Sequence, residues 1–366
     1  MALQAWKTEL NKTFDVVSLK DRLKTDPRLE HRLRMRGMLL QSIREHFNQD
    51  GFLEVQTPSL CATGDPALHL DSFKSELKWS NHRRILWMPT SPEHHMKRMV
   101  ASGLGNIYQI CRFYRNGELG PEHQPEFTGL EWYEVGASVS DTMERTERLV
   151  RKVSRDLLGN EPEIERNGYK VNFERPFNRI SMREALSEFA GIRVPTDWAT
   201  DVLRERVQQA GLNPSESDSF DDLINRAVVG RLEPAFSKMG SPVFLTGFPA
   251  PMAAMARLDQ QDPHIAERFE LYAGGLELCN GYGELTDPVE QRERFDKQLR
   301  KRLALSMPTP EMDEAFLTSL EQGMADCSGN AMGIDRLLML LSGADTIQEV
   351  TAFPIENELG WGMGDY

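Results

Sequence analysis

The hydrophobic pattern near the start of the chain predicts a helix followed by a strand. Between Glu30 and Asn48, apolar residues recur at the three- and four-residue spacing of a helical face, and Asp50-Gly51 then interrupts the pattern. The face carries Leu33, Leu39, Leu40, Ile43 and Phe47. The segment Phe52–Pro58 follows as a strand that ends at a proline, which cannot donate to a ladder. The proline either just terminates this strand or belongs to an interface element.

Further along the chain, short β-rich runs alternate irregularly with helical patterns. Strands are predicted over Arg84–Met88, Ile107–Tyr114, Phe127–Val135, Val243–Phe248, Leu276–Tyr282 and Glu349–Phe353. Helices are predicted over Pro92–Val100, Ser138–Leu158, Ser181–Ala190 and Gly333–Leu341. Ser181 and Glu184 have the spacing of a capping box at the start of one of these helices. Without regular β-α-β alternation, the pattern predicts an α+β fold around an antiparallel β-sheet flanked by helices.

The same pattern suggests one large domain. Residues 1–28 are polar and too few to fold alone, so we expect an N-terminal extension. Residues 29–366 then form the domain, with a mostly helical insertion at about 159–240 that includes a candidate hairpin. No internal repeat or low-complexity tract divides the chain.

Composition narrows the class of protein. The 366 residues are 40% hydrophobic and 27% charged, as in ordinary globular proteins. A net charge of −13 argues against a general nucleic-acid binder, although a local basic face stays open. The basic cluster Lys297–Arg302 either faces an acidic partner or is a solvated helix face. The four cysteines are scattered without a C-x-x-C pair, which favours reduced buried thiols over a disulfide or zinc framework. Met1–Thr13 lacks the apolar core of a secretory signal and no long apolar run follows, so we expect a cytoplasmic protein without a membrane anchor.

Two arginines are candidates for phosphate binding. Arg115 leaves a predicted strand at a turn, and Arg336 begins an apolar helix behind the small residues Gly329-Asn-Ala-Met-Gly333. A single arginine is more often a surface charge. Guanidinium groups at such turns, however, can grip phosphate oxygens bidentately, and small residues permit close approach of a ligand.

Several acids form a second candidate set. Glu270 and Glu277 flank the predicted Gly274-Gly275 hairpin turn, where they are either a solvated pair or a site for Mg²⁺ together with substrate phosphates. Alternation places Asn280, Tyr282 and Glu284 on one strand face. Together with Glu93, Glu131 and Tyr133 they suit a substrate with two amines, although each acid taken singly is more often on the surface.

These residues resemble the catalytic domain of class II aminoacyl-tRNA synthetases, specifically the lysyl branch. Phe52–Pro58 and its preceding helix resemble motif 1, Arg115 to Tyr133 resembles motif 2, and Gly329 to Arg336 resembles motif 3. The run from Glu277 to Asp287 resembles the lysine-pocket strand. The resemblance covers about residues 30–355 and implies ATP, Mg²⁺ and a homodimer.

Lysyl-tRNA synthetases also carry an N-terminal OB-fold domain that reads the anticodon, and here fewer than 30 residues precede the motif 1 helix. The resemblance is therefore to paralogues of that branch which activate (R)-β-lysine with ATP and attach it to a lysine side chain of elongation factor P. It implies that tRNA is not the acceptor. Ala331 stands where the synthetases have glycine, and a methyl group there is expected to favour the β-amine over α-lysine; neutral drift is the alternative.

The resemblance also implies a role for each matching residue. Arg115 and Arg336 would be catalytic and grip the phosphates of ATP, Phe127 would stack on adenine and His123 would lie near the triphosphate. The other expected ATP-binding residues are Asn116, Gly117, Glu118, Gln124, Glu277, Leu278 and Gly333. Those expected to bind the amino acid are Ser91, Glu93, Glu131, Tyr133, Asn280, Tyr282, Glu284 and Ala331. Glu270 and Glu277 would hold Mg²⁺.

Two departures and three alternatives accompany this hypothesis. Gly117 replaces the glutamate expected to contact adenine, with Glu118 next to it, and Gln124 replaces an asparagine. The alternatives are aminoacylation of tRNA in the manner of a lysine–tRNA ligase, transfer of another diamine to another protein acceptor, and a non-catalytic regulatory paralogue. The retained arginines and carboxylates favour an enzyme over the last.

Overall fold

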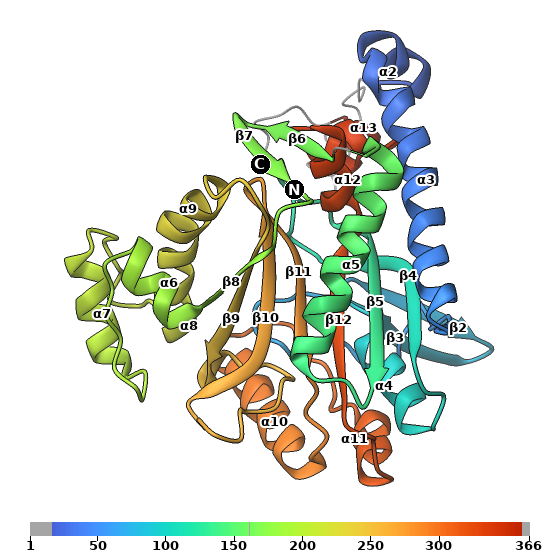
Figure 1. Cartoon of the computed structure of the whole chain (residues 1–366). Coiled ribbons are helices and arrows are strands. Elements are labelled where there is room, and N and C mark those ends of the chain that lie inside the picture. Colours follow the sequence, from blue (N-terminus) through green and yellow to red (C-terminus); the bar gives the residue numbers. More distant parts are fainter. Residues whose placement is uncertain (1–16, 161, 361–366) are drawn as a thin grey trace, which may run out of the picture.

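A computed structural model describes residues 17–160 and 162–360, so Met1–Thr13, for which we expected no signal sequence, lies outside the described residues. Its centre is an eight-stranded sheet in the order β1-β4-β5-β12-β11-β10-β9-β8 (Figure 1). In that order the strands span Leu53–Glu54, Ile107–Tyr114, Glu126–Val135, Cys327–Gly333, Leu276–Gly283, Ile265–Ala273, Val243–Pro249 and Asn178–Ser181. The six central strands pair antiparallel, whereas β1 and β8 at the edges pair in parallel. The predicted α+β fold with an antiparallel sheet is therefore confirmed, with parallel pairing added at both edges.

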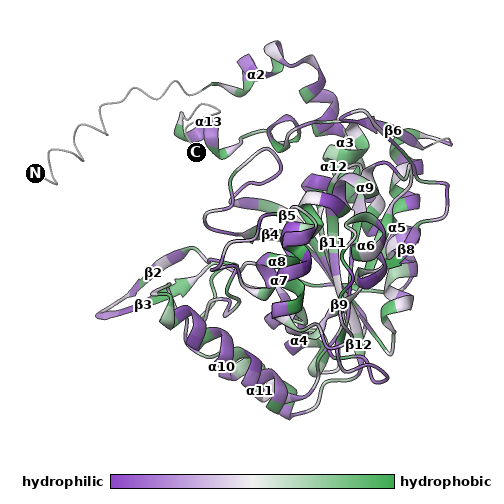
Figure 2. Ribbon diagram, turned by 90° about the vertical axis from the view of Figure 1, so that its left-hand side faces the viewer, coloured by the Kyte–Doolittle hydropathy of each residue, from purple (hydrophilic) through white to green (hydrophobic). Residues whose placement is uncertain are grey.

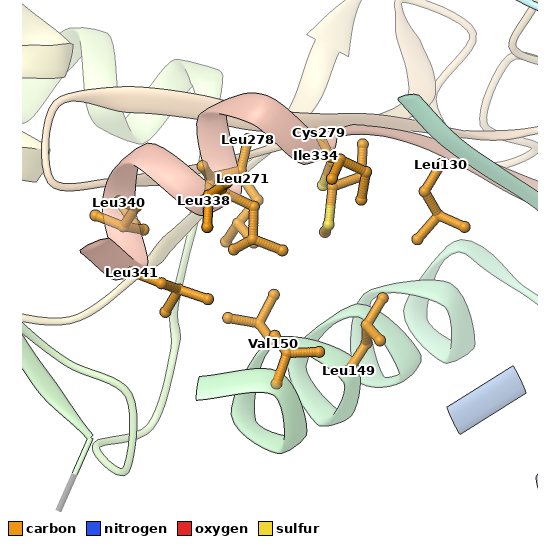
Figure 3. Close-up of a cluster of buried hydrophobic side chains, with 14 of the residues drawn as sticks. Leu130, Leu149, Val150, Leu271, Leu278, Cys279, Ile334, Leu338, Leu340 and Leu341 are labelled. Atoms are coloured by element: carbon orange, nitrogen blue, oxygen red, sulfur yellow. The ribbon is translucent and has the colours of Figure 1, made fainter. Parts of the chain in front are cut away.

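One face of the sheet packs against three helices. These are α3 (Pro27–Gln49), α5 (Val139–Leu158) and α12 (Ile334–Ser342). Leu130 and Leu271 of the sheet lie fully buried against Leu149 and Val150 of α5 and Leu338 of α12 (Figure 3). Because this face is filled with apolar side chains, polar residues that alternate with them along the strands must lie on the opposite face.

Two further layers enclose that opposite face. At one end α4 (Glu93–Ala101), α10 (Pro288–Ala304) and α11 (Glu314–Glu321) share a cluster around Met96, Phe295 and Phe316. On the other side, helices from residues 182–237 pack on β8, β9 and β10. They are α6 (Met182–Phe189), α7 (Thr200–Gln209), α8 (Phe220–Ala227), the π-helix η1 (Val228–Leu232) and α9 (Glu233–Ser237).

The remaining elements are short. A hairpin of β2 (Lys74–Trp79) and β3 (His82–Trp87) projects from the body (Figure 2), and a second hairpin joins β6 (Glu163–Arg166) to β7 (Tyr169–Asn172). The others are α2 (Leu19–Thr25), the 3₁₀ turns η2 (Ala250–Met252) and η3 (Ile347–Val350), and α13 (Ile355–Leu359).

Local signals explain the helix boundaries. Ser181 accepts from the Glu184 N–H while Glu184 accepts from the Ser181 N–H, which confirms the predicted capping box of α6. The same reciprocal pair, Ser138 and Asp141, begins α5.

The predicted strand at Glu349–Phe353 is wrong. Residues 347–350 form η3, because Thr346 and Glu349 cap one another and Val350 is buried in the core. Glu349 also accepts from Arg32 of α3 at 2.5 Å, so tertiary contacts outweigh the local β-propensity. The predicted Phe52–Pro58 strand is reduced to the two residues of β1, whereas β12, whose small residues gave little strand signal, is central to the sheet.

We expect Leu338→Ala to lower the free energy of unfolding by about 2–5 kcal/mol, because the fully buried side chain would leave a cavity between α12 and the sheet. Urea unfolding followed by circular dichroism measures this. The matched control is Leu303→Ala, whose side chain on α10 is 66% exposed and should change stability little. Equal effects of the two substitutions would contradict the packing described here.

Candidate active site

The sheet face opposite α5 and α12 carries a cavity of about 350 Å³. Most of the residues predicted from the sequence to bind ligands lie in its wall. They are Ser91, Glu93, Arg115, Glu118, His123, Gln124, Phe127, Glu131, Tyr133, Glu277, Leu278, Asn280, Tyr282, Glu284, Ala331, Gly333 and Arg336. Asn116, Gly117 and Glu270 are not among the lining residues. The cavity therefore gathers residues that are more than 240 positions apart in the chain.

The cavity exists because the residues of β12 on that face are small and leave space above the strand. Gly329 pairs with Tyr133 of β5 and Tyr282 of β11, and Ala331 pairs with Glu131 and Asn280 in the same way. A Cβ atom on Gly329 would lie 2.5 Å from Oε1 of Glu284 and 2.5 Å from the Tyr133 ring. Glycine is required here by space, because any larger residue would push the neighbouring side chains out of place.

A β-bulge directs Glu277 into the cavity. The register shifts between Leu271 and Tyr272, so that Glu270 lies opposite Asn280 whereas Tyr272 lies opposite Glu277. Simple alternation from Asn280 would place Glu277 on the other face. The bulge also explains Leu278, whose side chain is buried in the core beneath the sheet (Figure 3) and which therefore offers only its backbone to the cavity.

One end of the cavity is cationic. Arg336 donates to the carbonyl oxygen of Glu277 at 3.0 Å, and its Nη2 lies 2.6 Å from Nε2 of His123. Burial, together with the charge of Arg336, lowers the pKa of His123, so the imidazole is neutral at pH 7 and its Nε2 accepts from the guanidinium. Arg115 lies over the Phe127 ring at 5.2 Å and donates to the carbonyl oxygen of Thr90 at 3.4 Å. Arg115 also lies 3.8 Å from the Glu118 carboxylate, and Arg336 lies 3.8 Å from that of Glu277. These long ion pairs offset the two positive charges only in part, so both arginines can still attract an anion.

The turn after Arg115 explains why a glycine stands at position 117. The Glu118 N–H donates to the Arg115 carbonyl oxygen at 3.4 Å, and Gly117 has φ +84°. That conformation strongly favours glycine, so the residue fits the turn whatever it does for a ligand. Asn116 donates to Asp71 at 3.0 Å, and Glu118 is the acid of this segment that reaches the cavity.

Gln124 is held by the C-terminal helix. Its side-chain amide donates to Glu356 at 2.9 Å and accepts from the Ile355 N–H at 2.9 Å. The side chain borders the cavity, but these bonds occupy its donor and acceptor groups. It fixes α13 next to His123, whose ring contacts Arg336.

The opposite end of the cavity is rich in carboxylates. Glu93 begins α4, Glu131 lies on β5 and Glu284 follows β11. Lys97, fully buried, lies 2.6 Å from Oε1 of Glu93 and 2.5 Å from Oε2 of Glu284. The Tyr133 hydroxyl donates to Oε1 of Glu131 at 2.7 Å. Three acids with one internal cation make this end a site for positively charged groups.

Burial raises the pKa of these acids. It raises the pKa of Glu284 to about 7, although Lys97 opposes the shift. Burial and then the charge of Glu93 raise the pKa of Glu131 well above its usual value. Oε2 of Glu131 and Oδ1 of Asn280 are buried without a hydrogen-bond partner among the described residues. Such acceptors are costly unless a donor reaches them, so this end is suited to ammonium groups.

Glu270 lies behind Glu277 and not in the cavity wall. Its carboxylate accepts from Arg268 at 2.7 Å and from the Tyr272 hydroxyl at 2.5 Å. Partial burial and then the charge of Glu270 raise the pKa of Glu277 to about 7. Within residues 17–160 and 162–360, no three His, Cys, Asp or Glu side chains gather as a metal cage. A divalent ion bound by Glu277, supported by Glu270 and completed by phosphate oxygens, fits this arrangement.

Two cations of the site were not predicted from the sequence: Lys97, which pairs with Glu93 and Glu284, and Arg268, which pairs with Glu270. Lys97 stands four residues after Glu93 in a predicted helix, which is the spacing of an intrahelical ion pair and was an available signal. Arg268 precedes Glu270 by two residues and faces Tyr282 across the strand pair, a relationship that depends on the register.

Comparison with known proteins places the chain in a family. Residues 20–357 match the family model described as "tRNA synthetases class II (D, K and N)". A protein of Avibacterium paragallinarum named elongation factor P–(R)-β-lysine ligase is 38% identical over 88% of this chain and 94% of its own length. Proteins of the same name from Pasteurella multocida and Histophilus somni (strain 2336) are 37% and 36% identical over the same shares. Separately, none of the helices described here is long and apolar enough to cross a membrane.

We expect the cavity to bind a small diamine, such as 1,5-diaminopentane, more tightly as the pH rises from 6 to 8. Below pH 7 Glu284 is protonated and attracts an ammonium group less, so affinity should fall by up to about tenfold per pH unit. Calorimetric titration at several pH values measures this. Glu284→Gln should weaken binding and flatten its pH dependence; an unchanged profile would contradict the assignment.

Proposed function

Because the chain belongs to the class II aminoacyl-tRNA synthetase family, we propose that it is an ATP-dependent ligase that activates (R)-β-lysine as an adenylate and transfers it to a lysine side chain of elongation factor P. The observation that carries the proposal is the division of one cavity into a cationic end and a carboxylate end. ATP requires the first, and an amino acid with two ammonium groups requires the second. The names of the relatives supply the isomer and the acceptor.

The amino acid occupies the carboxylate end. Glu93, Glu131 and Glu284 attract its two ammonium groups. Oδ1 of Asn280, which has no hydrogen-bond partner within residues 17–160 and 162–360, accepts from one of them. Its carboxylate then faces the cationic end of the cavity. Ala331 lies between Glu131 and Asn280 in the register of the sheet, so its methyl group narrows the floor on which the amine rests.

ATP occupies the cationic end, where Arg115 and Arg336 bind its phosphates and the Phe127 ring is available to adenine. Glu277, with Glu270 behind it, would hold Mg²⁺, which would offset the charge of the phosphates. Arg336 is fixed by His123 and the Glu277 backbone and Arg115 by Thr90, so both charges are in place before ATP arrives.

The reaction then has two steps. A carboxylate oxygen of the amino acid attacks the α-phosphorus, the bond to the β-phosphate oxygen breaks, and pyrophosphate leaves. The neutral ε-amine of the acceptor lysine next attacks the activated carbonyl carbon, loses a proton and expels AMP, which leaves an amide. No side chain of this protein forms a covalent bond; catalysis rests on orientation and charge neutralisation.

The proposal includes a homodimer and a protein acceptor in place of tRNA. Met38 on α3 and Leu53 on the edge strand β1 are each 49% exposed in the single chain, as expected if a partner covers the motif 1 elements. The net charge of −13 is unfavourable for a polyanion such as tRNA.

The direct test incubates the protein with ATP, Mg²⁺, elongation factor P and each lysine isomer, followed by intact-mass and peptide mass spectrometry. A mass increase of one lysine residue on elongation factor P with (R)-β-lysine supports the proposal. Charging of lysine tRNA in a parallel reaction, with unmodified elongation factor P, would overturn it.

We expect Arg115→Ala to reduce amino-acid-dependent pyrophosphate exchange by about 10²–10³-fold, because one preorganised charge at the phosphates is lost. Arg112→Ala is the matched control: this arginine lies on β4, which ends just before Arg115, but its side chain is 52% exposed and pairs with Glu126 outside the cavity. Wild-type exchange by Arg115→Ala would show that the arginine does not act on ATP.

We expect Ala331→Gly to increase the use of α-lysine relative to (R)-β-lysine, because removing one methyl group widens the floor between Glu131 and Asn280. A single methyl group discriminates by about 10–200-fold at most. The ratio of kcat/KM for the two isomers in adenylate formation measures the change. An identical ratio in both proteins would assign Ala331 no part in selectivity.

A further inference from the structure

A buried lysine of α4, Lys97, pairs with two carboxylates of the cavity wall, one on α4 itself and one just after β11. Lys97 is fully buried, with its ammonium between Glu93 at 2.6 Å and Glu284 at 2.5 Å. Both carboxylates line the cavity, whereas Lys97 is not among the lining residues. The cation is therefore enclosed behind the two acids that face the ligand.

We propose that Lys97 is a positioning residue, whose enclosed ammonium orients Glu93 and Glu284 and favours the ionised form of Glu284, so that the two acids bind the ammonium groups of the substrate. For the identity of that substrate, the inference rests on the proposed function. Lys97 itself makes no contact with the ligand and acts only through the two acids.

The charges at this end of the cavity support the inference. Glu93, Glu131 and Glu284 bring three negative charges when ionised, and Lys97 removes one. The two that remain equal the charge of two substrate ammonium groups. Without Lys97, three acids would share a buried site, and protonation would replace ligand binding as the way to relieve their repulsion.

Lys97 is also the cation best placed to keep Glu284 ionised. Burial and Glu93 raise the pKa of Glu284, and among the groups that lower it Lys97 acts most strongly, ahead of Arg257. The other titratable groups nearby are Glu131 and Tyr133 of β5, Tyr282 of β11 and Cys327 of β12. None of these four is cationic. In return, Glu284 and Glu93 outweigh the effect of burial on Lys97 and raise its pKa, so Lys97 remains charged at neutral pH.

The test replaces Lys97 by methionine, which has a similar length and no charge, and by arginine, which keeps the charge. In pyrophosphate exchange at pH 7, Lys97→Met should raise the KM for (R)-β-lysine at least about 30-fold, with the KM for ATP nearly unchanged. Lys97→Arg should recover part of this loss. Lys152→Met is the matched control, because Lys152 also joins two carboxylates, Asp156 at 2.5 Å and Glu45 at 3.4 Å, on the outside of α5.

Titration of the Glu284 carboxyl distinguishes a positioning role of Lys97 from a contribution to fold stability alone. Carbon-13 NMR of proteins labelled at glutamate carboxyls, with Glu284 assigned by Glu284→Gln, gives its titration midpoint. That midpoint should rise by at least about one pH unit in Lys97→Met. An unchanged midpoint and an unchanged KM, accompanied only by a lower melting temperature, would reduce Lys97 to a structural role and overturn the proposal.

Two arrangements keep the test decisive. If Lys97→Met does not fold, Glu93→Gln is compared with Glu93→Gln/Lys97→Met, in which the loss of one acid offsets the loss of the cation. The double variant should have the higher Glu284 midpoint, and equal midpoints would overturn the proposal. If the wild-type protein shows no exchange with any lysine isomer, the proposed function fails. The NMR titration still decides whether Lys97 controls Glu284.

Discussion

The site depends on the close approach of three strands around Gly329. Tyr133 of β5 and Glu284 beyond β11 both extend over this position, at distances from a hypothetical Cβ that no side chain tolerates. The next residue on the same face, Ala331, adds only a methyl group. The small residues of β12 lower its intrinsic strand propensity. In return, it leaves a hollow in the middle of a packed sheet, which the side chains of the two flanking strands can line.

A second constraint is a buried carboxylate that joins α12 to β5 and α3. Asp335, at the start of α12, accepts from the Thr128 N–H of β5 at 2.6 Å and pairs with Arg36 of α3. One buried carboxylate thus joins the three segments that resemble motifs 1, 2 and 3. Arg336 is the next residue, so the direction in which it enters the cavity is set by the same contact. Breaking a buried pair of this kind leaves a charge uncompensated, which makes the arrangement specific.

The sequence predicted most of the helices and strands, and which residues share a strand face. The helices with capping boxes, the strands Ile107–Tyr114 and Leu276–Tyr282, and the grouping of Asn280, Tyr282 and Glu284 on one face follow from periodicity and agree with the structure. The failures need information from distant parts of the chain. Periodicity alone cannot reveal the bulge that turns Glu277 into the cavity, nor the burial of Val350 that makes residues 347–350 helical. The Mg²⁺-binding role expected of Glu270 stays a prediction; in the structure its carboxylate accepts from Arg268 and Tyr272.

Protonation explains how the sheet can hold several carboxylates close together in the cavity before a ligand binds. In the free protein, burial raises the pKa of Glu284 to about 7 and also raises that of Glu131, so protons partly neutralise the charge that Lys97 does not. Because these pKa values exceed those of an unfolded chain, ionisation of the acids destabilises the unliganded fold as the pH rises from about 4.5 to 7. An ammonium group that displaces the protons removes this cost. If the proposed diamine substrate binds at these acids, its binding is coupled to proton release, because its ammonium groups replace the protons on the carboxylates.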